Sequence, residues 1–452
     1  MKKVFSLLLS LLMLFTLATG CASNKKGDGA SKEAATALSE STVNKENTKE
    51  VTEKKKEENI SFATWDYGER KDMNDAIIKA FKEKLSINLE IVNYPTEQYA
   101  TMIQTKAAAG DAPDLINVHG SGSGYGKVLV ANKELLPIDG EPWLKNYSAD
   151  FIEGCKSVVD GKLYCVDVTI HVLGGIYKKQ LFKELGIVVP ECYEDFIDVC
   201  EKLKAKGIIP LMGGFKESWT TQMLTHQSIN QCLGEVGKTS QVFEKAEMKF
   251  SDPVYKKALA YFDEFVKKGY YGPQPLGTDA ATASKLIAQG KAGILVQGNW
   301  QLADIRKTDP DGEYGFFTIP FNKKGQQKFI SVSMKPTGSG GIAIYAKGKK
   351  IDAAKMALNL YHSDSDLQNI IVKEMGGVST NKIVKVDDKF LNEVIAAFNS
   401  GKPMPFPDGY NSQPVNDAYT RGLQGIAAGV ETIESVTARM DELKKKELEQ
   451  QQ

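Results

Sequence analysis

The sequence predicts an α/β protein whose folded part consists of two lobes. This part runs from about Ile60 to the C-terminus and spans about 390 residues, which is more than a single hydrophobic core usually organises. Within it, runs of β-branched and aromatic residues alternate with amphipathic segments of helical length. That alternation is typical of mostly parallel sheets flanked by helices on both faces. The residues before Ile60 differ in composition and are expected to lie outside the fold.

The first 21 residues are typical of an export signal. Two lysines precede an uncharged apolar run over residues 4–17, and small residues then lead to Cys21. The run is too short to span a bilayer comfortably, so a cleaved signal peptide over residues 1–20 is the better interpretation. A cysteine at this place resembles the lipobox of bacterial lipoproteins, although Ala18 stands where Leu is preferred. The resemblance implies lipidation of Cys21, and an ordinary signal peptide with an incidental cysteine is the alternative.

The segment after Cys21 is rich in Lys, Glu, Ser, Thr, Asn and Ala and has almost no large apolar side chain. Such a segment cannot bury enough surface to offset the entropy lost on ordering. We expect residues 21–59 to be a disordered tether, with a root-mean-square reach of roughly 35 Å. A tail without function is the alternative.

The folded part opens with strands and helices in alternation. The expected strands are residues 60–65, 87–92 and 114–118, and the expected helices are residues 72–85 and 99–109. Ligands of parallel sheets lie beyond the carboxyl ends of the strands. Trp65 and His119 fall at two such ends and are therefore candidate ligand contacts. Later in the chain we expect a strand at 175–177 and helices at 190–207, 355–361 and 433–443.

The overall charge and the cysteines exclude several classes of protein. The 57 basic residues balance the 57 acidic ones, and no basic run is interleaved with aromatic residues, which argues against nucleic-acid binding. With Cys21 lipidated, five cysteines remain, and no spacing among them suggests a metal site. We expect all five to be small buried residues without disulfides. A hairpin of residues 155–166 with a two-residue turn would separate Cys155 from Cys165, whereas a three-residue loop would bring them to one face.

No motif in the chain supplies catalytic chemistry. The glycine-rich residues 120–127 fail as a phosphate loop, because Ser121 and Val128 stand where Gly and Ser or Thr are required. The four histidines are scattered, and none belongs to an HExxH motif. Residues 309–312 lack the later ligands of a calcium loop and are interpreted as a turn. We therefore expect no cofactor and no metal.

Several segments, in order along the chain, resemble the extracellular solute-binding proteins of ABC importers, in the maltose-type, carbohydrate-binding group. The closest likenesses are to that family's AAGDAPD segment, its DGKLYG hairpin and its YYNKDLFKKAGI element. The matching segments are residues 107–115, 159–164, 176–187, 288–294 with 298–300, 314–320, 340–344 with 353–357, and 376–381. Cys165 and Asp167 depart from the family's hairpin, where Gly and Pro are usual.

The resemblance implies a two-lobe, periplasmic-binding-protein-like clamshell that closes on its ligand by hinge motion and carries out no covalent chemistry. The first lobe would hold residues 60–167 plus 331–376, and the second residues 168–330 plus 377–452. The protein would be a monomer on the extracellular face of a bacterial cell membrane, held there by its lipid anchor. Its partners would be a carbohydrate, expected to be an oligosaccharide, and the permease subunits of an importer driven by a cytoplasmic ATPase.

Sugar sites combine aromatic faces with polar groups that fix orientation. Trp300 occupies the position at which this family often stacks on sugar, and Trp219 lies in a loop flanked by Gly and Ser. Trp143, beside Pro142, is expected to be structural. The candidate ligand-binding residues are Trp65, Asp66, His119, Ser121, Glu217, Trp219, Trp300, Gly340, Gly341, Asp408 and Asn411.

Three other functions remain open at this point. The same clamshell could hold a polyamine, a peptide or a metal chelate, and a polyamine would need several carboxylates around a cation. A surface glycosidase would need two carboxylates about 5 to 10 Å apart across one cleft. A tethered adhesin would show no closure driven by a ligand.

Overall fold

The computed structural model describes residues 57–68, 70–120, 124–333 and 341–450. The chain divides into two units, residues 1–54 and 55–452, and all described residues belong to the second unit. The predicted signal peptide, the lipidation at Cys21 and nearly all of the predicted tether lie outside the described residues, as do Ser121 and Gly340. The tether was predicted to extend to residue 59, but the first strand begins at Glu58. The strand includes Asn59 because this residue pairs with Asn88 of the neighbouring strand. The Asn88 side-chain Nδ2 donates to Asn59 Oδ1 at 2.7 Å.

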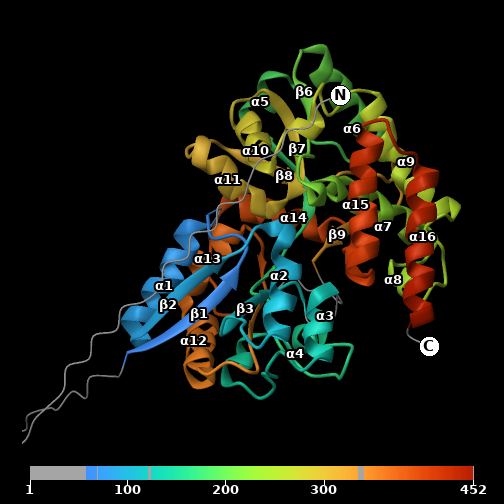
Figure 1. The fold of residues 1–452 in the computed structure, drawn as a ribbon. Helices are drawn as coiled ribbons and strands as arrows, with labels where there is room; N and C mark the ends of the chain where they lie inside the picture. The colour runs from blue at the N-terminus through green and yellow to red at the C-terminus, as the bar shows by residue number, and fades with distance from the viewer. Residues whose placement is uncertain (1–56, 69, 121–123, 334–340, 451–452) are drawn as a thin grey trace, which may run out of the picture. The chain divides into compact units, whose positions relative to one another are not determined.

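The first sheet has the strand order β10-β3-β1-β2 (Figure 1). Strand β1 (Glu58–Thr64) pairs in parallel with β2 (Ile87–Asn93) and with β3 (Leu115–Val118). Strand β10 (Gly341–Ile344) runs antiparallel to β3. The mostly parallel sheet predicted for the first lobe is therefore confirmed, with one reversed strand at its edge.

The helices of the first lobe come from both ends of its sequence. Helices α12 (Ile351–Ser363) and α13 (Ser365–Met375), orange in Figure 1, pack with α1 (Lys71–Leu85), which is blue. Apolar residues of these helices and of the sheet form two buried clusters. The other helices of this lobe are α2 (Thr96–Ala108), α3 (Gly124–Ala131), η1 (Pro142–Asn146) and α4 (Ala149–Cys155).

The second sheet, of order β6-β7-β5-β8, is mixed, which corrects the prediction of a mostly parallel sheet in this lobe. Strand β6 (Ile209–Met212) is parallel to β7 (Ala292–Gly298), but β5 (Leu173–Lys178) is antiparallel to both β7 and β8 (Tyr314–Phe317). The chain enters β5 from the first lobe and not through a helix packed on the same sheet. The right-handed crossover that makes consecutive strands parallel therefore does not apply to it.

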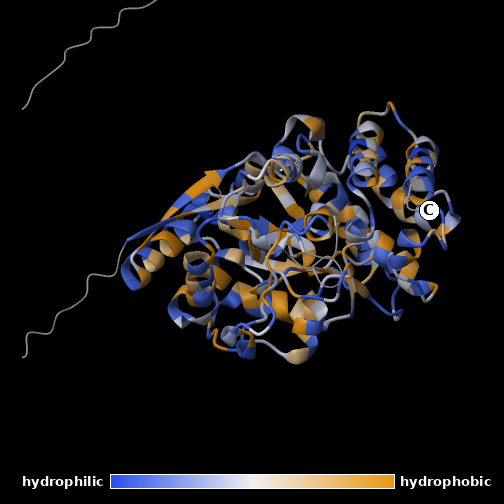
Figure 2. Ribbon diagram, turned by 60° about the horizontal axis from the view of Figure 1, so that its bottom comes forward, coloured by the Kyte–Doolittle hydropathy of each residue, from blue (hydrophilic) through white to orange (hydrophobic). Residues whose placement is uncertain are grey.

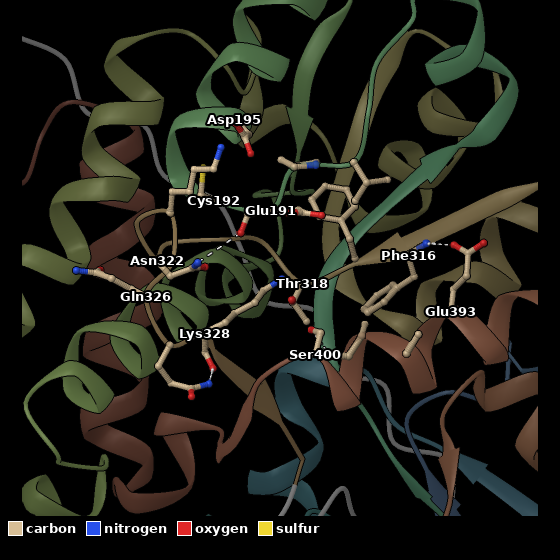
Figure 3. A pocket seen from close by; sticks show the side chains of 18 residues that line it. Glu191, Cys192, Asp195, Phe316, Thr318, Asn322, Gln326, Lys328, Glu393 and Ser400 are labelled. Carbon is tan, nitrogen blue, oxygen red and sulfur yellow. Dashed lines mark hydrogen bonds between the residues drawn. The ribbon is translucent and has the colours of Figure 1, made fainter.

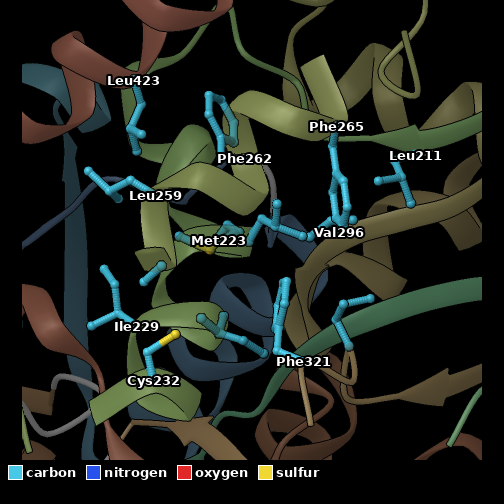
Figure 4. Close-up of a cluster of buried hydrophobic side chains, with 14 of the residues drawn as sticks. Leu211, Met223, Ile229, Cys232, Leu259, Phe262, Phe265, Val296, Phe321 and Leu423 are labelled. Atoms are coloured by element: carbon cyan, nitrogen blue, oxygen red, sulfur yellow. The ribbon is translucent and has the colours of Figure 1, made fainter. Parts of the chain in front are cut away.

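The second lobe has the larger core. Helix α7 (Gln222–Glu235) packs against α9 (Pro253–Lys267), and aromatic residues such as Phe262 and Phe265 fill the space between them and the sheet (Figure 4). Every residue of α7 from Gln222 to Leu233 is buried, including its polar ones. The remaining helices are α5 (Lys179–Glu184), α6 (Tyr193–Ala205), η2 (Ser218–Thr221), α8 (Gln241–Glu244), η3 (Pro275–Gly277), α10 (Ala280–Ala288), η4 (Asn299–Gln301), α11 (Leu302–Thr308), α14 (Lys389–Asn399), η5 (Pro407–Tyr410), α15 (Gln413–Ala427) and α16 (Ile433–Gln450).

Two short ladders join segments that are far apart in the sequence. Strand β4 (Thr169–Ile170) pairs with β11 (Val378–Ser379), and β9 (Phe329–Val332) pairs with β12 (Lys402–Pro405). The first ladder lies where the chain leaves one lobe for the other, because β4 follows the first lobe's last loop and β11 follows α13. Figure 2 shows helices whose turns alternate between hydrophobic and hydrophilic residues, as expected for helices that cover these sheets on one side.

The segment around Gly161 does not form the predicted hairpin. Helix α4 ends at Cys155, and a loop follows in which the backbone N–H of Ser157 donates to the carbonyl of Lys162 at 2.8 Å. Gly161 has a φ of +73°, which suits this tight loop. Among the described cysteines no disulfide is formed, and four of the five are buried; Cys155 is half-buried, contrary to the prediction that all five are buried. No described helix is long and apolar enough to cross a membrane.

Candidate functional site between two aromatic groups

The first aromatic group lies at the carboxyl ends of β1 and β3. Trp65 directly follows β1, and His119 directly follows β3. Their ring centroids are 4.2 Å apart in an edge-to-face arrangement, and the Trp65 ring is 4.8 Å from that of Tyr99. The prediction that Trp65 and His119 fall at neighbouring strand ends is therefore confirmed.

Hydrogen bonds to the backbone hold this group in place. The Tyr99 hydroxyl lies 3.0 Å from the Ala63 carbonyl oxygen and 2.7 Å from that of Asn117. The Tyr125 hydroxyl donates to the same Asn117 carbonyl at 3.2 Å and accepts from the backbone N–H of His119 at 3.1 Å. Because both rings are tied to the strands, the surface that they form is rigid.

His119 combines solvent exposure with dense surroundings. Its side chain is exposed, yet the protein around it desolvates the imidazolium and lowers the pKa of His119 to about 4. At neutral pH the imidazole is uncharged and offers one donor and one acceptor.

The Asp66 carboxylate is bound by other side chains of the first lobe. Its carboxylate accepts a 2.6 Å hydrogen bond from the Thr64 hydroxyl and pairs with Arg70 at 3.3 Å. Arg70 also donates from Nη1 to the carbonyl of Glu374 at 2.9 Å, at the end of α13. Arg70 was not predicted as a site residue, although its place four residues after Asp66 was a usable signal.

The second aromatic group is centred on Trp300, in η4 directly after β7. The Trp300 ring is 5.3 Å from the ring of His171 in an edge-to-face arrangement. It also lies against Gly298, where an added Cβ would stand only 1.8 Å from the ring. Trp300 is half-buried, so part of the indole is open to solvent.

Asn299 and His171 connect this group to the first lobe. Asn299 Oδ1 accepts from the backbone N–H of Val172 at 2.6 Å. Its Nδ2 lies 3.1 Å from His171 Nδ1 and donates to the backbone carbonyl of Met375 at 3.2 Å. Burial, and then the charge of Arg70, lowers the pKa of His171 to about 3, and the charge of His119 adds to the effect. Arg70 donates to Glu374 and Asn299 donates to Met375, so both groups are held at adjacent residues of α13.

Glu217 and Trp219 lie at a contact between the lobes. Ser218, in η2, donates from its N–H and its hydroxyl to the Glu97 carboxylate of α2, both at 3.2 Å. Trp219 beside it is half-buried and packs against the large core of the second lobe. The Glu217 carboxylate accepts from the N–H of Ala280 at 3.2 Å, and burial raises the pKa of Glu217.

Asp408 and Asn411 lie in or beside η5, which contacts α7. Burial raises the pKa of Asp408 to about 6. Asn411 is buried and donates to Asn416 Oδ1 at 3.1 Å, while its own Oδ1 has no partner among the described residues. His226 of α7 is a buried neighbour that was not predicted, and neither of its ring nitrogens has a partner in the described part of the chain.

Gly341 and Trp143 pack closely against their neighbours. Gly341 begins β10 and pairs with Val118, and an added Cβ there would lie 2.9 Å from the carbonyl of Val166, so a side chain does not fit. Trp143 is buried and stacks on His362 at 3.8 Å, as expected for a structural residue. Among the described residues no group of His, Cys, Asp and Glu could hold a metal ion.

A separate cavity of about 750 Å³ lies within the second lobe (Figure 3). It is bounded by the start of α6, the end of β8, the loop of residues 322–328 and helix α14. None of the predicted ligand-binding residues lines it.

Comparison with known proteins identifies the family. Residues 67–365 match the model of the bacterial extracellular solute-binding protein family. The multiple sugar-binding protein of Streptococcus mutans is 26% identical over 296 residues, which are 64% of this chain and 68% of the relative. The melibiose/raffinose/stachyose-binding protein MelE of Bacillus subtilis is 22% identical over 330 residues, 71% of this chain and 68% of the relative.

Among solved structures, a chitin oligosaccharide binding protein superposes with a TM-score of 0.72. It is 22% identical, and the superposition covers 86% of this chain and 98% of that one. At this level of identity the likeness establishes a shared two-lobe α/β fold.

Proposed function

The chain belongs to the family of bacterial extracellular solute-binding proteins, and from this we propose that it captures a carbohydrate, in particular an oligosaccharide, for delivery to the permease of an ABC importer. The observation that carries the proposal is the placement of two half-buried indoles, Trp65 and Trp300, in neighbouring groups on different lobes. Two of its relatives are named for binding sugars, which favours a sugar over a polyamine, a peptide or a metal chelate.

The aromatic groups suit the chemistry of a sugar. A pyranose ring offers an apolar face of C–H groups to an indole and a rim of hydroxyls to polar groups. Trp65 and Trp300, with Trp219 beside the Glu97–Ser218 contact, supply the aromatic surfaces. Polar groups come from both lobes and are supplied by His119, Glu217, Asp408 and Asn411. Asp66 completes them indirectly, because it holds Arg70 in place by an ion pair. Ser121, Gly340 and Gly341 complete the proposed set.

We place the lobes at residues 60–167 plus 331–376 and 168–330 plus 377–452, with closure about the segments that cross between them. The four buried clusters support this division to within two residues: two draw on residues up to 168 and from 342 to 371, and two on residues 172–332 and 390–440, so that Val168 and Val332 fall just across the proposed bounds. Binding would occur without covalent chemistry, in keeping with a family of binding proteins.

The proposal extends to the N-terminal segment. A signal peptide over residues 1–20 would be cleaved, and lipid on Cys21 would hold the protein, as a monomer, on the extracellular face of the membrane. The partners would then be permease subunits with a cytoplasmic ATPase. Cys21→Ala should release the protein from the membrane fraction into the medium, and retention of that variant in the membrane would contradict lipid anchoring.

A thermal-shift screen of the chain from residue 55 onward against a glycan panel tests the ligand class. A ligand that binds only the folded state stabilises it by about 2.7 kcal/mol at a hundredfold excess over its dissociation constant. We expect one oligosaccharide to raise the melting temperature and Trp300→Ala to abolish that rise. Trp143→Phe, outside the proposed site, serves as the control and should keep the rise.

The panel includes spermidine, short peptides and a ferric chelate. A rise with one of these and with no glycan would overturn the carbohydrate proposal while leaving the family fold intact. Release of reducing sugar from a bound glycan would indicate a glycosidase. A rise that Trp300→Ala leaves unchanged would contradict the site.

A further inference from the structure

Polar side chains line part of the cavity in the second lobe. Thr318, directly after β8, and Asn322, in the following loop, are both buried, and Figure 3 places them at its centre and side. Thr318 Oγ1 and Asn322 Oδ1 have no hydrogen-bond partner among the described residues. A buried polar atom without a partner costs about 1 to 3 kcal/mol, so a donor group that a small side-chain rotation brought to either oxygen would be favoured.

Charged side chains of both signs line this cavity, and four of them form no ion pair with a described residue: Glu191, Asp195, Lys324 and Lys328. Glu191 precedes α6, and Lys328 lies at the far end of the loop; both line the cavity. Neither forms an ion pair with a described residue, although the charge of Glu191 acts on Lys328. Burial lowers the pKa of Lys328 to about 8. The third carboxylate, Glu393, is already engaged by the Phe316 N–H at 2.9 Å and by Lys179.

These groups define a complementary ligand. An ammonium group satisfies the two unpartnered oxygens and Glu191, and a carboxylate satisfies Lys328. The side chains of Val189, Pro190, Phe316 and Phe317 line the rest of the cavity and offer apolar surface to a carbon skeleton. We propose that the cavity bounded by Glu191, Thr318, Asn322 and Lys328 is a second binding site, for a small zwitterion, namely an α-amino acid or a short peptide.

This site is independent of the carbohydrate proposal, because it lies within one lobe and shares no residue with the aromatic groups. Isothermal titration calorimetry of the purified protein with glycine, serine, glutamine and glycylglycine tests it. Acetate and ethylamine, which each carry one of the two charges, serve as half-ligands. We expect at least one zwitterion to bind and both half-ligands to bind at least tenfold more weakly.

Two variants test whether the heat of binding measured by calorimetry comes from the cavity. Lys328→Met removes the cation, and Thr318→Val replaces the unpartnered hydroxyl with a methyl group of similar size; each should weaken zwitterion binding about tenfold. Lys323→Met, an exposed neighbour that does not line the cavity, should leave binding unchanged. Circular dichroism and melting temperature establish that the variants fold, and Trp300→Ala should retain zwitterion binding.

The proposal is overturned if none of the four zwitterions binds. It is also overturned if the two cavity variants bind as tightly as the unaltered protein, because the ligand then lies elsewhere, or if acetate or ethylamine alone binds as tightly as a zwitterion.

Discussion

The two lobes share one architecture but differ in how completely their buried polar groups are paired. In the first lobe, the tyrosine hydroxyls behind Trp65 reach backbone carbonyls, and Asp66 and Arg70 pair with each other. In the second lobe, the fully buried α7 carries His226 and Asn230 with unpartnered atoms, and Gln297, Thr318 and Asn411 add further ones. Within the described residues, nine of the thirteen unpartnered buried side-chain atoms lie on the second lobe, and Asn74, Glu134, Trp143 and His362 carry the four on the first.

This difference in pairing suggests that the two lobes contribute different kinds of contact to ligand binding. Paired tyrosines make the first lobe a rigid surface that offers aromatic faces. Unpartnered polar atoms are costly unless water or a ligand satisfies them. The second lobe should therefore contribute most of the polar recognition, and its larger aromatic core offsets the cost of carrying those atoms.

The largest expected effect tests whether the lobes are energetically separate. Phe262→Ala in the second core and Phe81→Ala in the first each remove a fully buried ring. Each should lower the free energy of unfolding by about 3 to 5 kcal/mol, through lost burial and the cavity left behind. Denaturant titration measures the loss, and hydrogen exchange locates it.

We expect Phe262→Ala to lower protection mainly in α7 and α9, and Phe81→Ala mainly in β1, β2 and α1. If both variants lowered protection equally in both lobes, the lobes would unfold as one unit, and the contrast between them would not extend to stability.

A smaller effect tests the aromatic side of the comparison. Gly298→Ala places a Cβ where the Trp300 ring now lies, so the indole must move while the β7 backbone can stay in place. We expect about tenfold weaker binding of the sugar identified by the glycan panel, which is about 1.4 kcal/mol. Gly277→Ala is the matched control, because an added Cβ there meets nothing within 4 Å. Equal affinity of the two variants, measured by calorimetry, would show that the position of Trp300 is unimportant.

Periodicity predicted the local elements of the first lobe well. Helix α1 begins one residue before its predicted start, and α2 begins three residues earlier than expected, at Thr96. The placement of Trp65 and His119 at the carboxyl ends of strands followed from one rule, that ligands lie beyond those ends, and their mutual contact was not predicted. Chain length and the alternation of elements predicted an α/β fold of two lobes, and the resemblance to a known family supplied the clamshell arrangement and the lobe boundaries.

The errors and omissions arise where contacts are long-range. The direction of β5 depends on where the chain enters the sheet, and hydrophobic periodicity carries no direction. His171 and Asn299 are 128 residues apart, and a lone histidine gives no sequence signal of its partner. Sequence reasoning named Asp66 as a ligand contact but could not show that Arg70 already occupies its carboxylate.

The smallest expected effect concerns a single carboxyl group of the second lobe. The pKa of Asp408 is raised to about 6, whereas that of an unfolded Asp is about 3.9. Between about pH 4 and pH 6 the folded state binds more protons than the unfolded state, so this group makes folding less favourable as pH rises. Asp408→Asn removes the effect, and the variant should be about 1 kcal/mol more stable than the unaltered protein at pH 7 and equal to it at pH 4.

The sign separates Asp408 from the histidines, which titrate in the same range. Burial lowers the pKa of His226 to about 3; its contribution is present above about pH 6.5 and is lost as pH falls. In the unaltered protein the two slopes oppose each other, so Asp408→Asn should steepen the loss of stability on acidification. Urea titrations at pH 7, 5.5 and 4 measure this, with the exposed Asp417→Asn as control. If the two variants have the same slope, Asp408 is as well hydrated as a surface carboxylate, and the second lobe has one fewer desolvated polar group to present to a ligand.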